Sequence, residues 1–195
     1  MQTVYRTNVI SGVVLPRTKV VTAVLVFGFA LLTALAAQIE IPLGFTPVPV
    51  TGQTFAVLLA GAVLGSGAGA ASQVLYVAMG AGGLPFYAGG ESGWTYATGS
   101  TAGYLVGFVV AAWLVGFLAE RGQDRTVTAA VPAFLTGSLV IYLFGVPWLA
   151  NVLNTGWVEA AGLGATPFIL GDLVKIALAG SLLPAAWKLV GALKR

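Results

Sequence analysis

The chain has 195 residues, of which 58% are hydrophobic and only 8% are charged, with a net charge of +3, whereas about a quarter of the residues in soluble domains are charged. A soluble fold of this length cannot bury so much apolar surface, which excludes a soluble globular protein and predicts one integral membrane domain over residues 1–195. The sequence contains no cysteine and no histidine, which excludes disulfides, imidazole or thiolate metal sites and Ser-His-Asp catalysis, and with them most enzyme classes.

Long uncharged stretches, interrupted by glycine, proline and charged residues, predict six membrane-spanning helices, since one span takes about 20 residues. The predicted helices cover residues 20–40, 53–65, 69–83, 100–119, 127–150 and 170–190. The second and third are short for a bilayer, and the turn between them is short enough to make them a hairpin. A β-barrel would need alternating apolar and polar residues, which these runs of Leu, Val and Ala do not show. The predicted fold class is therefore all-α integral membrane.

The basic residues predict how these helices are oriented. Eight of the nine lie before the first helix, between the fourth and fifth, or at the end of the chain: Arg6, Arg17, Lys19, Arg121, Arg125, Lys188, Lys194 and Arg195. In a six-helix chain these segments share one side of the membrane, so the positive-inside rule predicts that both termini are cytoplasmic. The predicted outer loops, residues 41–52, 84–99 and 151–169, contain no Lys or Arg.

A signal peptide is the alternative interpretation of the N-terminus. Basic residues there precede an apolar run that ends in Ala34-Leu35-Ala36, which matches an A-x-A cleavage site. Small residues also have a use within membrane helices, and we therefore favour a first spanning helix.

The first two outer loops are unusual connectors. Residues 41–54 contain three prolines, each of which fixes φ and removes a backbone donor, so we expect an extended, stiff lid between the first and second helices. Because this lid is apolar, we expect it to fold back into the protein. The second loop combines four aromatic residues, from Phe86 to Tyr96, with glycines, which favours binding of a flat ring. The alternative is an aromatic belt at headgroup depth, as for Trp148 and Trp157.

One charged pair interrupts the last apolar run. Asp172 and Lys175 are three residues apart, so on a helix they share a face. Each charge costs about 2.5 to 3.5 kcal/mol near the centre of a span, and such residues usually pair or line a cavity. They are the leading binding candidates, because a carboxylate and an ammonium together match a ligand with N–H and C=O groups. The alternative is a self-neutralising structural pair at the outer membrane surface.

Other motifs carry less information. Gly65, Gly67 and Ala70 match G-x-G-x-x-A, but no strand precedes them, so we interpret them as a tight turn and not as a dinucleotide site. No G-x-x-x-x-G-K-[ST] sequence occurs, so any dependence on ATP has to come from other chains. Ala30 and Ala34 form a small-x-x-x-small pattern, which allows close contact with another helix.

Five ordered blocks together resemble the BioY family, the biotin-specific S-components of energy-coupling factor (ECF) vitamin transporters. The blocks are Pro47-Val48-Pro49-Val50-Thr51 with Gln53-Thr54, Gly83-Leu84-Pro85-Phe86 with Ala88-Gly89-Gly90, Gly103-Tyr104 with Gly107-Phe108, Gly145-Val146-Pro147-Trp148-Leu149, and Pro167-Phe168 with Gly171-Asp172 and Lys175. The resemblance implies six helices in the cell membrane with both termini inside, a biotin pocket on the extracellular side beneath the first loop, and no catalysis.

The resemblance also implies roles for individual residues. Asp172 and Lys175 would match a polar pair near the ureido ring of biotin, although pairing of Lys175 with the biotin carboxylate remains open. The blocks that line the pocket would include Gln53, Phe86, Tyr87, Gly89, Gly90 and Tyr104. Ala30 and Ala34 would dock on a transmembrane coupling subunit, which works with two ATPase subunits, and no metal or cofactor is expected. Glu91 departs from the family pattern and adds an outer negative charge that does not help to attract a carboxylate.

Three other functions compete with high-affinity biotin capture and uptake. The first is an S-component or secondary carrier for a different vitamin, since the resemblance alone identifies the ligand. The second is an integral membrane enzyme that uses Asp172 or Glu159 as a general base. The third is a structural assembly subunit, which predicts no saturable ligand.

Overall fold

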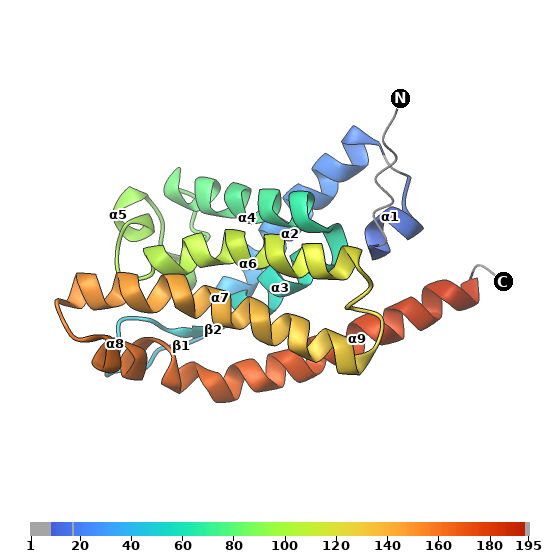
Figure 1. The fold of residues 1–195 in the computed structure, drawn as a ribbon. Helices are drawn as coiled ribbons and strands as arrows, with labels where there is room; N and C mark the ends of the chain where they lie inside the picture. Colours follow the sequence, from blue (N-terminus) through green and yellow to red (C-terminus); the bar gives the residue numbers. More distant parts are fainter. Residues whose placement is uncertain (1–8, 17, 194–195) are drawn as a thin grey trace, which may run out of the picture.

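Long helices form where the apolar runs lie, and short elements fill the segments between them. The computed structural model describes residues 9–16 and 18–193, and Figure 1 shows the arrangement of its elements. The long helices are α2 (Lys19–Ala37), α3 (Gln53–Leu64), α4 (Ser66–Ala81), α6 (Ala102–Glu120), α7 (Val127–Leu153) and α9 (Ile169–Leu193). The short elements are α1 (Ile10–Val14), β1 (Glu40–Ile41), β2 (Val50–Thr51), η1 (Ala88–Gly90), α5 (Trp94–Ala97), α8 (Trp157–Gly164) and η2 (Thr166–Phe168).

Each predicted helix overlaps one long helix, but some ends differ. α4 begins at Ser66 instead of residue 69, because Gly65 alone turns the chain with a φ of 87°. Glu120 in α6 stabilises this start by accepting hydrogen bonds from the Ser66 backbone nitrogen at 2.7 Å and from the Ser66 hydroxyl at 2.9 Å. α7 continues through Pro147 to Leu153 instead of ending at residue 150.

Several of these helices have the length and the apolar composition of membrane-spanning helices. Within the described residues, four helical segments are long and apolar enough to cross a bilayer: Lys19–Ala37, Ala102–Glu120, Val127–Leu153 and Trp157–Ala192. α3 is apolar but shorter. The structure is therefore a mostly helical one with several membrane-capable helices.

The segment between α2 and α3 folds into a small hairpin. β1 and β2 pair antiparallel, with Glu40 opposite Thr51 and Ile41 opposite Val50. The Gly52 backbone nitrogen donates hydrogen bonds to the carbonyl oxygens of Ala36 at 3.1 Å and Ile39 at 3.0 Å. These bonds fix the end of β2 against the end of α2, and they place the start of α3 directly beside the hairpin.

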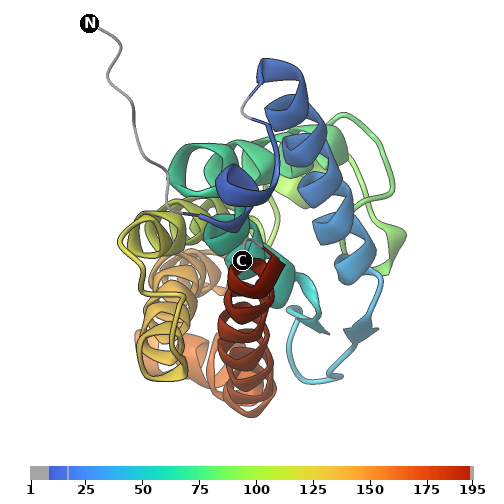
Figure 2. The same ribbon diagram turned by 90° about the vertical axis from the view of Figure 1, so that its right-hand side faces the viewer.

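α6 packs against three of the other long helices. It contacts α3, α4 and α7, and the end-on view in Figure 2 shows it between α4 and α7, with α3 on its inner side. Glycines allow the close approach: a Cβ atom at Gly107 would lie 2.9 Å from the Cα of Ile141 in α7, and one at Gly116 would lie 2.6 Å from the Cα of Ser66 in α4. Without side chains at these points, the backbones pack at distances that larger residues forbid.

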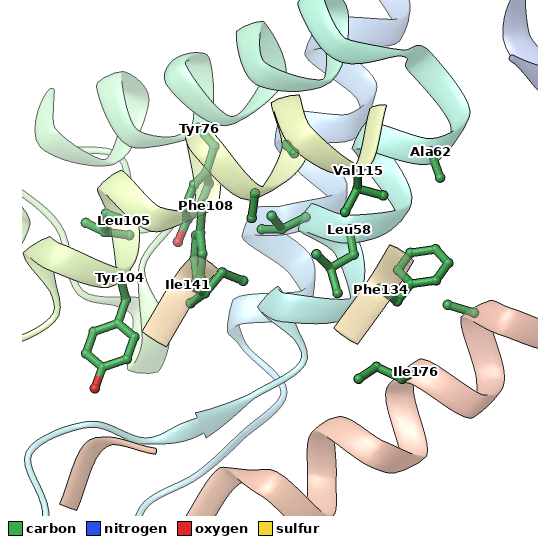
Figure 3. Close-up of a cluster of buried hydrophobic side chains, with 14 of the residues drawn as sticks. Leu58, Ala62, Tyr76, Tyr104, Leu105, Phe108, Val115, Phe134, Ile141 and Ile176 are labelled. Carbon is green, nitrogen blue, oxygen red and sulfur yellow. The ribbon is translucent and has the colours of Figure 1, made fainter. Parts of the chain in front are cut away.

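The apolar core joins α3, α6, α7 and α9. Figure 3 shows Leu58, Val115 and Phe134 facing one another, with Ile176 of α9 below Phe134. These four side chains are buried. Each buried aliphatic or aromatic side chain contributes about 1.5 to 3 kcal/mol when a chain leaves water. In a bilayer that drive is absent, and close packing of these side chains holds the helices together instead.

A polar cluster is buried between α2 and α4. Gln73 is fully buried, and its side-chain nitrogen donates to Ser72 Oγ at 3.0 Å and to Thr33 Oγ1 at 3.3 Å. The Ser72 hydroxyl in turn donates to the Gly69 carbonyl oxygen at 2.7 Å. Only the bond between Gln73 and Thr33 joins the two helices. A bond between helices in an apolar medium typically contributes about 0.6 to 2 kcal/mol, so this one helps to fix α2 against α4.

The two ends of the bundle differ in composition. Figure 1 shows β1, β2, α5 and α8 at one end, with α1 and the C-terminal part of α9 at the other. Four basic residues are at the α1 end or in the nearby α6–α7 connection: Lys19, Arg121, Arg125 and Lys188. Arg6, Arg17, Lys194 and Arg195, which also supported the predicted orientation, lie outside the described residues.

The connection between α6 and α7 is fastened to α9 at this end. Asp124 is buried and accepts a hydrogen bond at 2.6 Å from Nε1 of Trp187. Burial raises the pKa of the Asp124 carboxyl, while the hydrogen bond from Trp187 lowers it. The guanidinium of Arg125 lies over the Trp187 ring, 4.8 Å from its centroid.

Candidate functional site

A cavity lies between the hairpin and the ends of α3, α6, α7 and α9. It contains about 550 Å³ of unfilled space when the solvent at its open mouth is included. Its polar lining comprises Thr51, Gln53, Thr54, Tyr96, Thr101, Tyr104, Tyr142, Asp172 and Lys175. Its apolar lining comprises Val48, Pro49, Ala88, Leu105, Phe108 and Phe168.

The cavity is narrow. The space in which the centre of a water molecule can move is about 60 Å³, which suffices for a few waters. A ligand with a ring system therefore has to spread the lining side chains. The hairpin supplies Val48, Pro49 and Thr51 of that lining.

Asp172 is held by donors from three helices. Its Oδ1 accepts a hydrogen bond from Thr54 Oγ1 of α3 at 3.3 Å. The same oxygen forms an ion pair with Lys175 Nζ at 3.2 Å. Its Oδ2 accepts a hydrogen bond from the Tyr142 hydroxyl of α7. Asp172 is only 5% exposed, so these donors replace water around a charge that is costly to bury.

Lys175 keeps a donor for the cavity. Its ammonium donates to Thr54 Oγ1 at 2.8 Å and to Asp172 Oδ1 at 3.2 Å. A lysine ammonium has three N–H donors, so among the described residues one donor remains for a molecule in the cavity. The predicted pair therefore lines a cavity that is open at one side, and its role in binding stays a prediction.

Gln53 is positioned by two hydroxyl groups. Its side-chain nitrogen donates to the Tyr76 hydroxyl at 2.6 Å, and its side-chain oxygen accepts from the Thr51 hydroxyl at 2.8 Å. Tyr76 is completely buried in α4. These bonds hold Gln53 at the first turn of α3, where it lines the cavity as the sequence predicts.

Tyr104 forms one wall and joins two segments. Its ring points out of the apolar core (Figure 3), and its hydroxyl donates to the Gly164 carbonyl oxygen at 2.7 Å. This bond fixes α8 of the third outer loop against α6. Tyr104 lines the cavity, and its contact with a ligand stays a prediction.

The structure does not bring the other predicted loop residues to the cavity. Tyr87 is buried, stacks on Tyr96 with ring centroids 5.0 Å apart, and donates through its hydroxyl to the Val77 carbonyl oxygen at 2.8 Å. Gly89 and Gly90 have φ values of 70° and 74° and are exposed, and Phe86 is half-buried. In this segment only Ala88 lines the cavity. Ligand contacts by Phe86, Tyr87, Gly89 and Gly90 stay a prediction.

Ala30 and Ala34 are buried between α2 and its neighbouring helices. They are 0% and 5% exposed, and their helix α2 packs against α3 and α4. A partner that contacts them directly requires α2 to move away from these neighbours, so their docking role stays a prediction. The exposed face of α2 carries Val20, Val24 and Phe27 instead.

Thr54 and Tyr142 are site residues that the sequence analysis did not select. Both bind Asp172 directly. Thr54 directly follows Gln53 in the proline-rich block, so its position beside a predicted pocket residue could have indicated that it lines the same pocket. Tyr142 is a tyrosine within an otherwise apolar helix, and a hydroxyl at such depth needs a partner. Nothing in the sequence, however, indicates which way α7 rotates toward Asp172.

Comparisons against known proteins match both the sequence and the fold. A family model described as the BioY family matches residues 8–192. A Rhizobium etli protein called biotin transporter BioY is 38% identical over 160 residues, which cover 78% of this chain and 85% of that protein. A Pyrococcus horikoshii protein called probable biotin transporter BioY is 43% identical over 151 residues, which cover 77% of this chain and 86% of that protein.

The fold also has a solved counterpart. A crystal structure of the S-component for biotin from an ECF-type ABC transporter superposes with a TM-score of 0.78 at 25% sequence identity. The superposition covers 87% of this chain and 92% of that chain.

Proposed function

This chain belongs to the BioY family, and we propose that it captures biotin from outside the cell as the substrate-binding subunit of an ECF-type transporter. The names of its relatives and the matched S-component support this function. The observation that carries it is the cluster of Asp172, Lys175, Thr54 and Tyr142 at the wall of an otherwise largely apolar cavity.

The cluster suits the ureido group of biotin. A ureido group presents two N–H donors and one carbonyl acceptor. Asp172 accepts from an N–H, and Lys175 donates its remaining hydrogen to the carbonyl oxygen. The apolar side chains, among them Leu105, Phe108 and Phe168, hold the bicyclic ring and the valeryl chain through the hydrophobic effect.

The opposite orientation is less favourable on electrostatic grounds. A biotin carboxylate at Lys175 would lie beside Asp172, whose Oδ1 is only 3.2 Å from the same ammonium. Two carboxylates at that spacing repel each other strongly in a buried site. The ureido group has no net charge and avoids this repulsion.

The transport role requires partners and a membrane orientation. We place the chain in the cell membrane with six spans and both termini in the cytoplasm, which puts the cavity on the outer side. The sequence has no P-loop motif, so the energy for uptake comes from two ATPase subunits through a transmembrane coupling subunit. The chain itself performs no catalysis and needs no metal or cofactor in this role.

Equilibrium binding of labelled biotin to the purified chain tests the proposal. Asp172→Asn and Lys175→Ala should each weaken binding by about 1 to 3 kcal/mol, since each removes a buried charge-assisted hydrogen bond. Excess thiamine and riboflavin should not compete. Ser181→Ala is the matched control, because Ser181 is an exposed residue of α9 that bonds only to the carbonyl oxygen of Ala177.

Two results would contradict the proposal. One is an affinity for biotin that stays within twofold in both variants. The other is competition by thiamine or riboflavin at the same concentrations as unlabelled biotin, which would make the chain a carrier of another vitamin. A chain that binds no labelled ligand at all would favour the structural subunit instead.

A further inference from the structure

The donors around Asp172 leave one of its oxygen atoms with room for a ligand. A carboxylate offers about two acceptor sites on each oxygen. Both sites of Oδ1 are used, by Thr54 Oγ1 at 3.3 Å and by Lys175 Nζ at 3.2 Å. Among the residues that the structure describes, Oδ2 accepts a hydrogen bond from the Tyr142 hydroxyl alone. The acceptor site that remains for an N–H group in the cavity is therefore the second site of Oδ2.

Tyr142 commits its hydrogen to this carboxylate. A tyrosine hydroxyl has one hydrogen to donate, and Tyr142 donates it to Asp172 Oδ2. Both residues line the cavity, with Tyr142 in the middle of α7 and Asp172 in the first turn of α9. Because Oδ1 is held from α3 and Oδ2 is held from α7, the carboxylate is fixed from both sides and its two oxygens do not exchange places.

A glycine fixes the rotation of α7 that brings Tyr142 to Asp172. Gly145 lies three residues after Tyr142 and shares its face of the helix. A Cβ atom at Gly145 would overlap the ring of Tyr104, so this ring packs directly on the backbone of α7. The Tyr104 hydroxyl donates to the Gly164 carbonyl oxygen at 2.7 Å, which holds the ring in place. The packing of α6 on α7 thus supports the position of Tyr142 independently of its own hydrogen bond.

We propose that Tyr142 is a positioning residue for ligand recognition, and that Asp172 Oδ2 is the atom that accepts an N–H group of the ligand. Tyr142 directs the open site of Oδ2 into the cavity, and Lys175 donates its third hydrogen to the carbonyl oxygen beside that N–H group. The ligand class that fits carries N–H and C=O on the same edge of a ring, as in a cyclic urea or a lactam. This inference rests on the proposed function, because it takes the ureido ring of biotin to lie at Asp172.

Two analogues of biotin test which atoms meet. In each analogue a CH2 group replaces one of the two ureido N–H groups, so the ring becomes a lactam with a single N–H. Each analogue competes with labelled biotin for the purified chain. The analogue that lacks the N–H at Oδ2 should bind about 10- to 100-fold more weakly than biotin, because it loses a hydrogen bond to a charged group.

Tyr142→Phe tests the positioning role. It should weaken the binding of biotin by about 3- to 10-fold, as expected for the loss of one hydrogen bond, and it should weaken the analogue that keeps the N–H at Oδ2 by the same factor. The analogue that lacks this N–H should change by less than twofold. In an Asp172→Asn background, Tyr142→Phe should also change the affinity for biotin by less than twofold, since the carboxylate that it positions is gone.

Thr136→Val is the matched control. Thr136 is an exposed residue of α7 whose hydroxyl donates to the Pro132 carbonyl oxygen of the same helix at 2.8 Å, and it does not line the cavity. Its substitution removes a hydroxyl group from α7 without touching the site, so the affinity for biotin should stay within twofold. Thermal unfolding of all variants in detergent is measured alongside binding.

The outcomes separate this role from the proposed function. A biotin affinity in Tyr142→Phe that is unchanged or tighter overturns the positioning role, whether or not the variant unfolds at a lower temperature. An equal loss for biotin and both analogues, or the same loss in the Asp172→Asn background, shows a purely structural role and overturns it as well. If neither analogue binds the parent chain more weakly than biotin, the assignment of Oδ2 is wrong while biotin binding stands. Failure of the parent chain to bind labelled biotin overturns the proposed function itself.

Discussion

At the scale of single residues, Asp172 is tolerated in an apolar bundle because hydrogen-bond donors surround its carboxylate. Thr54 and Lys175 contact Oδ1, and Tyr142 contacts Oδ2. A buried ion pair of this kind is a weak source of stability compared with apolar residues of the same volume. Its placement in the wall of a cavity is therefore better explained by recognition of a polar ligand than by a need to hold α9 in place.

Tyr76 and Gln53 should behave as a coupled pair. Tyr76→Phe removes the acceptor for the Gln53 side-chain nitrogen, which lies 2.6 Å from the hydroxyl in a site that is only 7% exposed. An unsatisfied buried donor costs about 1 to 3 kcal/mol, and we expect the free energy of unfolding in detergent to fall by that amount. Gln53→Met in the same background should recover part of the loss, because no buried amide then lacks a partner. Losses that simply add in the double variant would contradict the coupling.

The sequence predicted some site residues for a clear physical reason. Asp172 and Lys175 stand out because charges are rare in apolar runs, and Gln53 and Tyr104 stand out within the blocks of the resemblance, which the family match confirms. Thr54 and Tyr142 do not stand out in this way, since hydroxyl groups occur on helices without a functional role. The aromatic residues and glycines of its loop predicted Tyr87 to be a ligand contact. Its hydroxyl instead donates to a carbonyl oxygen of α4, and its ring packs beside the ring of Tyr76.

At the scale of elements, small residues decide how closely the helices pack. α6 carries glycines where it meets α4 and α7. Because these neighbours approach so closely, many side chains of α6 are buried. The predicted helices matched the structure because long apolar runs leave few alternatives. The short elements α1, α5 and α8 were not predicted, because segments of so few residues carry no periodic signal and depend on contacts with the bundle.

Gly107→Ala tests this packing. The new Cβ atom would lie 2.9 Å from the Cα of Ile141 and 3.0 Å from its carbonyl oxygen, so α6 and α7 have to separate. We expect the free energy of unfolding to fall by about 1 to 3 kcal/mol, as for other overpacked sites. Gly28→Ala is the matched control, since a Cβ atom there meets nothing within 4 Å and alanine is the better helix former. Equal effects of the two substitutions on thermal unfolding would argue against close packing at Gly107.

At the scale of the whole molecule, the cavity lies between the β1–β2 hairpin and the ends of α3, α6, α7 and α9. α3 has 12 residues and is about 18 Å long at about 1.5 Å per residue, which is shorter than the apolar thickness of about 30 Å of a bilayer. The hairpin that precedes α3 covers the cavity with Val48, Pro49 and Thr51, while Ile41 and Phe45 of the same hairpin are exposed. In the orientation we propose, the cavity therefore lies within the outer half of the bundle.

That orientation can be tested directly because the sequence contains no cysteine. Gly44→Cys places a thiol in the hairpin loop, where a Cβ atom meets nothing within 4 Å, and Gln123→Cys places one in the exposed connection between α6 and α7. In intact cells a membrane-impermeant maleimide should label Gly44→Cys at once and Gln123→Cys only after permeabilisation. Ser72→Cys is the control: its position is fully buried, so labelling should require denaturation. Labelling of Gln123→Cys but not Gly44→Cys in intact cells would place the cavity on the cytoplasmic side, and a chain oriented in that way could not capture biotin from outside.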